Sequence, residues 1–206
     1  MPNCASGTME APSGWMTARR PVAAVCVLMA APLLLGQSSA EMRRDPAPWT
    51  LEYCALRGKT DVAKMLLALG ADPNKPGAGG VTPLHLAAMK DHAGVVEALL
   101  AHGAKVNVRD DAGQTPLHEA ALGGSAKAAE ILLAHGAEID AKDRESGATP
   151  LYYAATWGRV AVTQLLLQKG AAVNVADAKG VGILRATEQN GQSEAAALLR
   201  KYGAVE

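Results

Sequence analysis

Five histidines are the side chains of this 206-residue chain best suited to bind a metal ion or to transfer protons. His85 and His118 each end a Thr-Pro-Leu-His tetrapeptide and lie 33 residues apart, and His102 and His135 have the same separation. A zinc ion takes about four ligands within ~2 Å, whereas equivalent positions on packed helices lie about 10 Å apart. We therefore expect His85 and His118 to tether a turn to its threonine, and His92 to lie exposed in a turn. The sequence predicts no metal site and no cofactor.

Other residues that could do chemistry also have structural interpretations. The segment 77–80, Gly-Ala-Gly-Gly, has the composition of a phosphate-binding loop but not its spacing or its lysine. The charged segments 110–111 and 143–145 contain paired acids that could serve acid–base catalysis, but we expect them in solvated loops, where nothing shifts a carboxyl pKa. Cys54 stands where later segments have alanine, so we expect a small buried hydrophobic side chain. These features predict a protein without catalytic activity.

The chain repeats itself with a period of 33 or 34 residues. Five glycines mark this period, and each is followed by alanine: Gly70, Gly103, Gly136, Gly170 and Gly203. Self-similarity at such a period is typical of proteins built from stacked repeats. A single copy cannot bury its own apolar face, so we expect adjacent copies to share one continuous core.

The three central copies each contain the residues that begin a helix. Threonine at the N-cap can accept a hydrogen bond from a free backbone N–H, proline suits the first helical position, and leucine faces a neighbour. These residues are Thr82, Pro83 and Leu84, then Thr115, Pro116 and Leu117, and then Thr149, Pro150 and Leu151. A second helix with a leucine-rich face is expected in each copy, over 95–102, 127–135 and 160–169.

Residues 82–88 read T-P-L-H-L-A-A, residues 115–121 read T-P-L-H-E-A-A and residues 149–155 read T-P-L-Y-Y-A-A. This motif and the period closely resemble the ankyrin repeat. The resemblance implies an all-α solenoid of about five helix-turn-helix repeats joined by hairpin-like loops. The expected repeats cover about 47–77, 78–110, 111–143, 144–177 and 178–206.

The two outer copies depart from the motif and are expected to cap the stack. In the last copy Arg200 stands where the central copies have an apolar leucine. A terminal repeat has no outer neighbour, so a charged residue is acceptable there. This substitution predicts a monomer that does not grow end to end.

The N-terminus has the pattern of a secretory signal peptide. Arg19 and Arg20 precede an apolar run over 22–35, and small residues stand at Ser38 and Ala40. We therefore expect residues 1–40 to be a signal peptide that is cleaved after Ala40. The run is too short to span a bilayer comfortably, so we expect no stable membrane anchor after cleavage.

Export follows from this interpretation and leaves three questions open. Translation from Met16 would give a more compact signal peptide than translation from Met1. The Arg19-Arg20 pair also leaves the twin-arginine route as an alternative to general secretion. Residues 41–46 are expected to form a short linker, and the mature protein is expected in the periplasm or outside the cell.

The charge balance argues against a nucleic-acid partner. The chain has 20 Lys and Arg side chains and 20 Asp and Glu side chains. Removal of residues 1–40 takes away two arginines and one glutamate, which leaves 18 basic and 19 acidic side chains, a net charge of −1. A protein that binds nucleic acid usually carries a basic stripe.

The resemblance implies that a protein partner binds the concave surface, made of the loop tips and the exposed sides of the first helices. Mapped residue by residue, this surface comprises Val81, Met89, Lys90, Arg109, Asp111, Gln114, Leu122, Lys142, Glu145, Ala148, Thr156 and Trp157. Trp157 is the predicted anchor, since aromatic residues dominate interface energies. The alternative is that Trp157 packs over its own turn and only caps the core. One extra residue in loop 140–147 is expected to make that loop project further.

The leading prediction is an exported, non-catalytic protein-binding module that blocks, scaffolds or protects a protein partner. A metal-dependent sensor or enzyme is an alternative, and stoichiometric metal in the purified protein would favour it. A self-associating structural stack is a second alternative, which light scattering would distinguish from a monomer.

Overall fold

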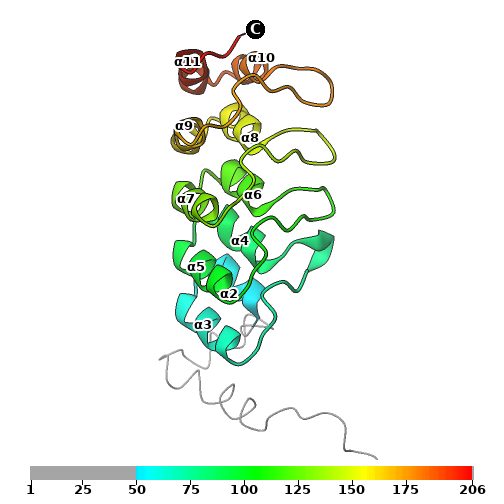
Figure 1. Ribbon diagram of the computed structural model, residues 1–206, viewed down its shortest axis with the longest axis vertical. Helices are drawn as coiled ribbons and strands as arrows, with labels where there is room; N and C mark the ends of the chain where they lie inside the picture. The colour runs from blue at the N-terminus through cyan, green and yellow to red at the C-terminus, as the bar shows by residue number, and fades with distance from the viewer. Residues whose placement is uncertain (1–49, 206) are drawn as a thin grey trace, which may run out of the picture. The chain divides into compact units, whose positions relative to one another are not determined.

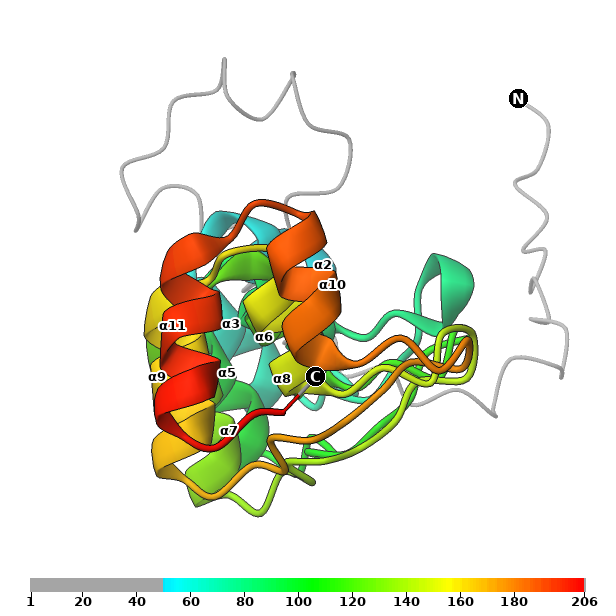
Figure 2. The same ribbon diagram turned by 90° about the horizontal axis from the view of Figure 1, so that it is seen from above.

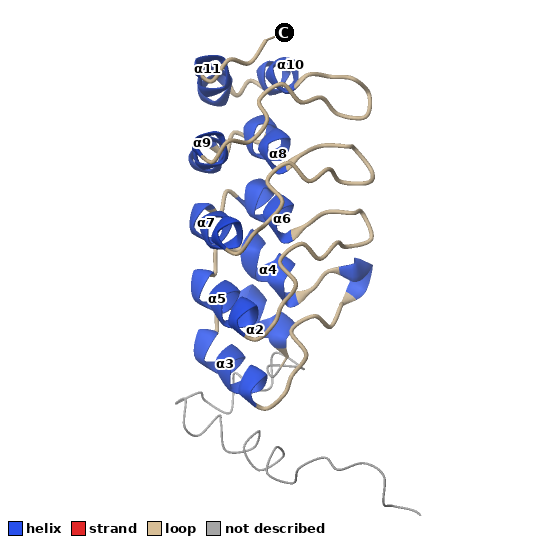
Figure 3. Cartoon of the chain, in the orientation of Figure 1, coloured by secondary structure: helices blue, strands red, loops and turns tan. Residues whose placement is uncertain are grey.

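The computed structural model describes residues 50–205 of the chain. The predicted signal peptide 1–40, its cleavage after Ala40, the start at Met16 and the linker 41–46 lie outside the described residues. Residues 50–205 form ten α-helices, one short 3₁₀ helix and no strand, which confirms the all-α prediction (Figure 3).

The helices come in five antiparallel pairs along the chain. The inner helices, as we name the first helix of each pair, are α2 (Leu51–Arg57), α4 (Pro83–Met89), α6 (Pro116–Gly123), α8 (Pro150–Thr156) and α10 (Ile183–Gln189). The outer helices are α3 (Thr60–Ala68), α5 (Ala93–Ala101), α7 (Ala126–Ala134), α9 (Val160–Gln168) and α11 (Ser193–Lys201). The 3₁₀ helix η1 (Ala78–Gly80) lies in the loop before α4. The predicted second helices are confirmed, with ends shifted by up to two residues.

The pairs stack into a two-layered solenoid. Each inner helix packs against the inner helix of the next pair and against its own outer helix. The inner helices form one column and the outer helices another, and the long loops leave the inner column on one side (Figure 1). Seen from above, the loops extend at an angle from the inner helices (Figure 2). We call the surface on the inside of this angle, formed by the loops and the inner helices, the inner face.

Threonine and proline begin the central inner helices as the sequence predicts. Thr82 and Thr115 form reciprocal capping boxes with the histidine three residues later, and proline follows each threonine. The Thr149 hydroxyl accepts a hydrogen bond of 3.3 Å from the Tyr152 N–H. These contacts satisfy backbone donors that an uncapped helix would leave unpaired.

The core is built from leucine and alanine at equivalent places in successive repeats. The leucines Leu84, Leu117, Leu151, Leu99, Leu132, Leu166 and Leu199 have no exposed surface. Cys54 is also fully buried, as predicted, and this burial together with the nearby Glu52 raises the thiol pKa to about 11. Glycine ends the outer helices, where Gly103 (φ 86°) and Gly136 (φ 85°) take the left-handed conformation that a side chain disfavours.

A ladder of asparagines joins neighbouring repeats behind the loops. Asn74 donates a hydrogen bond of 2.9 Å to the Gly103 carbonyl and accepts one of 2.8 Å from the Lys105 N–H. The same two bonds join Asn107 to Gly136 and Glu138, and Asn174 to Gly203 and Val205. Asp140 takes this place in the third step, between Asn107 and Asn174, and accepts only from the Ala172 N–H, because a carboxylate cannot donate.

The Asp140→Asn variant is expected to be more stable than the wild type by about 1 kcal/mol, the net value of one hydrogen bond. The new amide can donate to the Gly170 carbonyl, as the other three asparagines do to their glycines. Urea unfolding of the full chain measures the change. Glu130→Gln, on the exposed side of α7, is the matched charge control and is expected to stay within about 0.5 kcal/mol of the wild type. Equal stability of the two variants would contradict the ladder.

Candidate protein-binding surface

Backbone hydrogen bonds join the tips of successive loops along the inner face. The Asp111 N–H donates to the Gly79 carbonyl over 3.0 Å, and the Arg144 N–H donates to the Ala112 carbonyl over 2.9 Å. The next step joins the Ala178 N–H to the Ser146 carbonyl over 2.7 Å. The four loops are therefore one connected edge and not four independent segments.

Arg109 links two of these loops while part of its side chain stays exposed. Its Nη1 donates to the carbonyl oxygens of Gly113 (2.9 Å) and Lys142 (2.8 Å). Its Nη2 lies 3.5 Å from a carboxylate oxygen of Glu138. The predicted contact residue thus also holds its neighbours in place, and its loss would disturb more than one contact.

The prediction that the charged segment 143–145 is wholly solvated is wrong at Asp143. The Asp143 side chain is 5% exposed, and its carboxylate accepts hydrogen bonds from the Ser146 hydroxyl (2.6 Å), the Tyr153 hydroxyl (2.6 Å) and two backbone N–H groups. Burial alone would raise the Asp143 pKa, but these hydrogen bonds outweigh it and lower the pKa. The extra residue of this repeat lies in the turn 143–148, because the Asp143 N–H bonds to the Ala148 carbonyl, whereas the Asp110 N–H bonds to the Gln114 carbonyl.

Tyr153 connects the loops to the inner helices, and the sequence analysis missed it. Its hydroxyl accepts a hydrogen bond of 3.2 Å from the Gln114 side-chain amide, and its ring meets the His118 ring edge-on at 5.9 Å. Leu86 and Glu119 hold the equivalent position in the two preceding repeats, so the repeat pattern gives no signal for a polar contact here.

His85 and His118 tether their own turns, as predicted, and also reach the next repeat. Nδ1 of His85 lies 2.9 Å from the Thr82 hydroxyl, and Nε2 lies 3.2 Å from the Gln114 carbonyl. His118 makes the same contacts with Thr115 (2.9 Å) and with the Ala148 carbonyl (3.2 Å). A carbonyl only accepts, so Nε2 carries the proton and Nδ1 accepts from threonine. Burial lowers the pKa of both imidazoles and keeps them neutral.

Stability is therefore expected to fall as the pH drops below about 6.5, the unfolded-state pKa of histidine. The unfolded chain then takes up protons that the buried rings of His85 and His118 resist, so the stabilisation present above that pH is lost. The slope can reach about 1.4 kcal/mol per pH unit for each histidine. Urea unfolding at a series of pH values measures it, and His85→Gln should make the slope shallower. An unfolding free energy that stays constant between about pH 7 and pH 5.5 would contradict the conclusion that His85 and His118 are neutral when they bond to the next repeat.

Trp157, the predicted anchor, lies on the surface at the end of the inner helix α8. Trp157 is 58% exposed, which favours the predicted anchor over the alternative that it packs over its own turn. Lys90 is exposed, and Met89 and Leu122 are half-buried at the equivalent ends of α4 and α6. In the loops Val81 and Gln114 are half-buried, and Asp111, Lys142 and Glu145 are exposed.

Two predicted contact residues are wrong because they face the interior. Thr156 is 7% exposed, and its hydroxyl donates to the Tyr152 carbonyl over 2.7 Å. Ala148 is 2% exposed, and its carbonyl accepts a hydrogen bond from Nε2 of His118.

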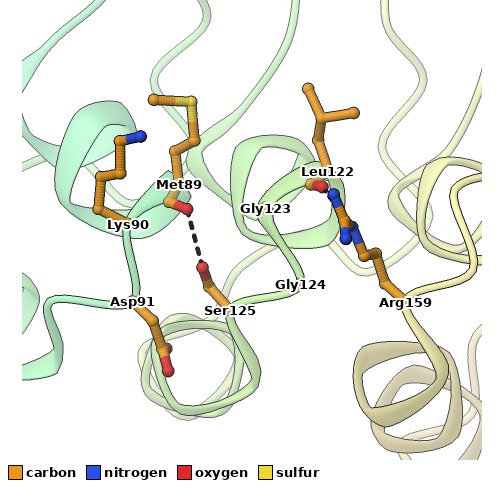
Figure 4. Close-up of a pocket in the computed structure, with 8 residues that line it drawn as sticks. All are labelled: Met89, Lys90, Asp91, Leu122, Gly123, Gly124, Ser125 and Arg159. Carbon is orange, nitrogen blue, oxygen red and sulfur yellow. Dashed lines mark hydrogen bonds between the residues drawn. The ribbon is translucent and has the colours of Figure 1, made fainter.

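Side chains from each helix–helix turn reach back to the previous repeat, and the sequence analysis missed this contact. Ser125 Oγ donates to the Met89 carbonyl over 3.0 Å, and Arg159 Nε donates to the Leu122 carbonyl over 2.9 Å (Figure 4). His92 Nε2 lies 3.2 Å from the Leu56 carbonyl. His92 is half-buried and bonded, so the prediction of an exposed histidine is wrong.

Among residues 50–205, no three His, Cys, Asp or Glu side chains come together in a way that could hold a metal ion. His102 and His135 each bond a carbonyl of their own helix, those of Ala98 and Ile131, through Nδ1. Over the same residues, no helix has the length and apolar content needed to cross a bilayer.

Comparison with known proteins agrees with the repeats seen in the structure. No curated protein matches the chain. The family model "Ankyrin repeats (3 copies)" matches residues 51–143 and, in a second overlapping match, residues 111–177. Together the two matches span more than half of the chain and cover its first four helix pairs. Domains of this family are typically non-catalytic modules that bind other proteins. The chain therefore belongs to the ankyrin repeat family.

Proposed function

We propose that this protein is an exported, non-catalytic module that binds a protein partner through its inner face. The observation that carries the proposal is the exposed Trp157 at the end of α8, in a protein whose successive loop tips are joined by hydrogen bonds. An exposed tryptophan with methionine and leucine nearby is a suitable anchor for an interface.

Rigidity is the proposed source of affinity. The bonded loop edge, the buried Asp143 carboxylate and the histidine bridges hold the inner face in one shape before a partner arrives. A preformed surface loses little conformational entropy on binding, so more of the contact energy appears as affinity.

Affinity capture from the exported fraction of the source cells tests this proposal. The full chain is used as bait beside its Met89→Ala and Trp157→Ala variants. We expect a captured protein to be retained less by both variants. A protein retained undiminished by both would contradict binding through the inner face.

Export rests on the signal-peptide pattern of residues 1–40. We expect the protein recovered from the exported fraction to begin at Glu41, and N-terminal sequencing measures this. An exported protein that retains residues 1–40 would contradict cleavage after Ala40. In a strain that cannot cleave the signal, peptides from residues 1–15 would contradict translation from Met16.

We also propose that the protein acts as a monomer. Arg200 of α11 pairs with Glu188 of α10, so the last repeat has a charged pair at positions where the central repeats have leucine and alanine. This placement disfavours end-to-end stacking. Light scattering of the full chain should give the mass of one copy at all concentrations.

A further inference from the structure

A groove opens at the ends of α4 and α6, where the two inner helices turn into their outer helices (Figure 4). It has a volume of about 480 Å³. We call it the glycine groove, and its lining residues are Met89, Lys90, Asp91, Leu122, Gly123, Gly124, Ser125 and Arg159. Met89, Lys90 and Leu122 belong to the predicted binding surface and lie together in this groove.

Gly123 is the reason that the groove exists. The equivalent positions in the neighbouring repeats hold Lys90 and Trp157, both exposed. A Cβ atom on Gly123 would overlap the Met89 carbonyl oxygen, so the α6 backbone packs directly on the preceding repeat. The row of long side chains along the helix ends is therefore interrupted at this repeat.

The groove has a positive charge that the protein does not neutralise. Lys90 forms no ion pair within residues 50–205. Arg159 uses Nε to hold the Leu122 carbonyl, and its two terminal nitrogens have no partner among the described residues. Asp91 is the one acidic residue in the lining. Its carboxylate accepts from the Ala128 N–H over 2.9 Å and points toward α7, away from Lys90 (Figure 4).

Apolar surface lies between the two cations. The side chains of Met89 and Leu122 point the same way from the ends of α4 and α6, with Lys90 on one side and Arg159 on the other (Figure 4). Adjacent inner helices are about 10 Å apart, which an extended chain covers in about three residues.

We propose that the glycine groove binds an extended acidic segment of a protein partner. Two carboxylates about three residues apart pair with Lys90 and Arg159, and an apolar side chain between them packs on Met89 and Leu122. The inference rests on the proposed protein-binding function and specifies the chemistry of the partner. A nucleic acid is disfavoured, because the chain as a whole carries equal numbers of basic and acidic side chains.

A random 12-residue peptide library displayed against the full chain tests this inference. We expect enriched peptides to carry pairs of Asp or Glu about three residues apart with an apolar residue between them. In titrations of the enriched peptides, Lys90→Glu should weaken binding about tenfold, the value of ~1.4 kcal/mol. Lys127→Glu, the same charge reversal on the exposed side of α7, should leave binding unchanged.

Four results would overturn the inference: no enrichment, enrichment without the acidic pattern, equal effects of Lys90→Glu and Lys127→Glu, or full displacement of the peptides by inorganic phosphate at constant ionic strength. Circular dichroism of both variants verifies that they fold. These failures are separable from failure of the proposed function, because loss of partner capture in Trp157→Ala would still support binding through the inner face.

Discussion

The Leu132→Ala variant is expected to lose about 2–5 kcal/mol of unfolding free energy, the usual cost of a leucine removed from a close-packed core. Leu132 is fully buried in α7, which packs against α5, α6 and α9. The cavity would therefore destabilise the packing of this repeat and, through it, the packing of both neighbouring repeats. Domains of this size are stable by only about 5–15 kcal/mol, so the effect is large. Urea unfolding followed by far-ultraviolet circular dichroism measures it.

Leu69→Ala is the matched control for this prediction. Leu69 follows α3 and is an exposed leucine, so the same truncation removes little buried surface. We expect its effect to be within about 0.5 kcal/mol of zero, as for most surface substitutions. Equal losses for Leu69→Ala and Leu132→Ala would contradict the stacked core.

The Trp157→Ala variant is expected to weaken partner binding by about 2 kcal/mol or more, roughly 30-fold, as for a typical aromatic hot spot. Trp157 is mostly exposed in the free protein, and in the proposed complex the partner would bury it. The unfolding free energy should therefore change by less than about 0.5 kcal/mol. Isothermal titration of the captured partner gives the binding constant, and urea unfolding gives the stability.

Tyr202→Ala controls for the loss of an exposed aromatic side chain. Tyr202 follows the outer helix α11 and lies away from the ends of the inner helices. We expect partner binding to be unaffected by this variant. If Tyr202→Ala weakens binding as much as Trp157→Ala does, the inner face is not the interface.

The helices could be predicted because the central repeats contain the residues that begin and end a helix. Thr115, Pro116 and His118 specify the start of α6, and the glycine after α7 specifies its end. Those signals recur at a fixed period, so a repeat with a clear motif also predicts the helix positions in the repeats whose motif is degenerate. Gly182 shows the limit of such local signals: it replaces the capping threonine, yet α10 still begins at Ile183, because packing against α8 and α11 stabilises the helix.

The surface was less predictable because exposure depends on the hydrogen bonds of individual side chains, which the pattern shared by the repeats does not specify. Met89 and Thr156 occupy equivalent positions, but methionine is long enough to reach the groove, whereas threonine bonds back to the Tyr152 carbonyl. Asp143 is buried only because Tyr153 and Ser146 cover it from a helix and from its own loop. The motif shared by the repeats does not contain that information, because the residues at these positions differ from one repeat to the next.

Amide hydrogen exchange of the full chain, with and without its captured partner, would locate the interface. We predict slower exchange in the loop tips over 78–82, 110–114 and 143–147 and at the ends of α4, α6 and α8, with the outer helices unchanged. Slower exchange confined to the outer helices, or no change anywhere in residues 50–205, would contradict binding through the inner face.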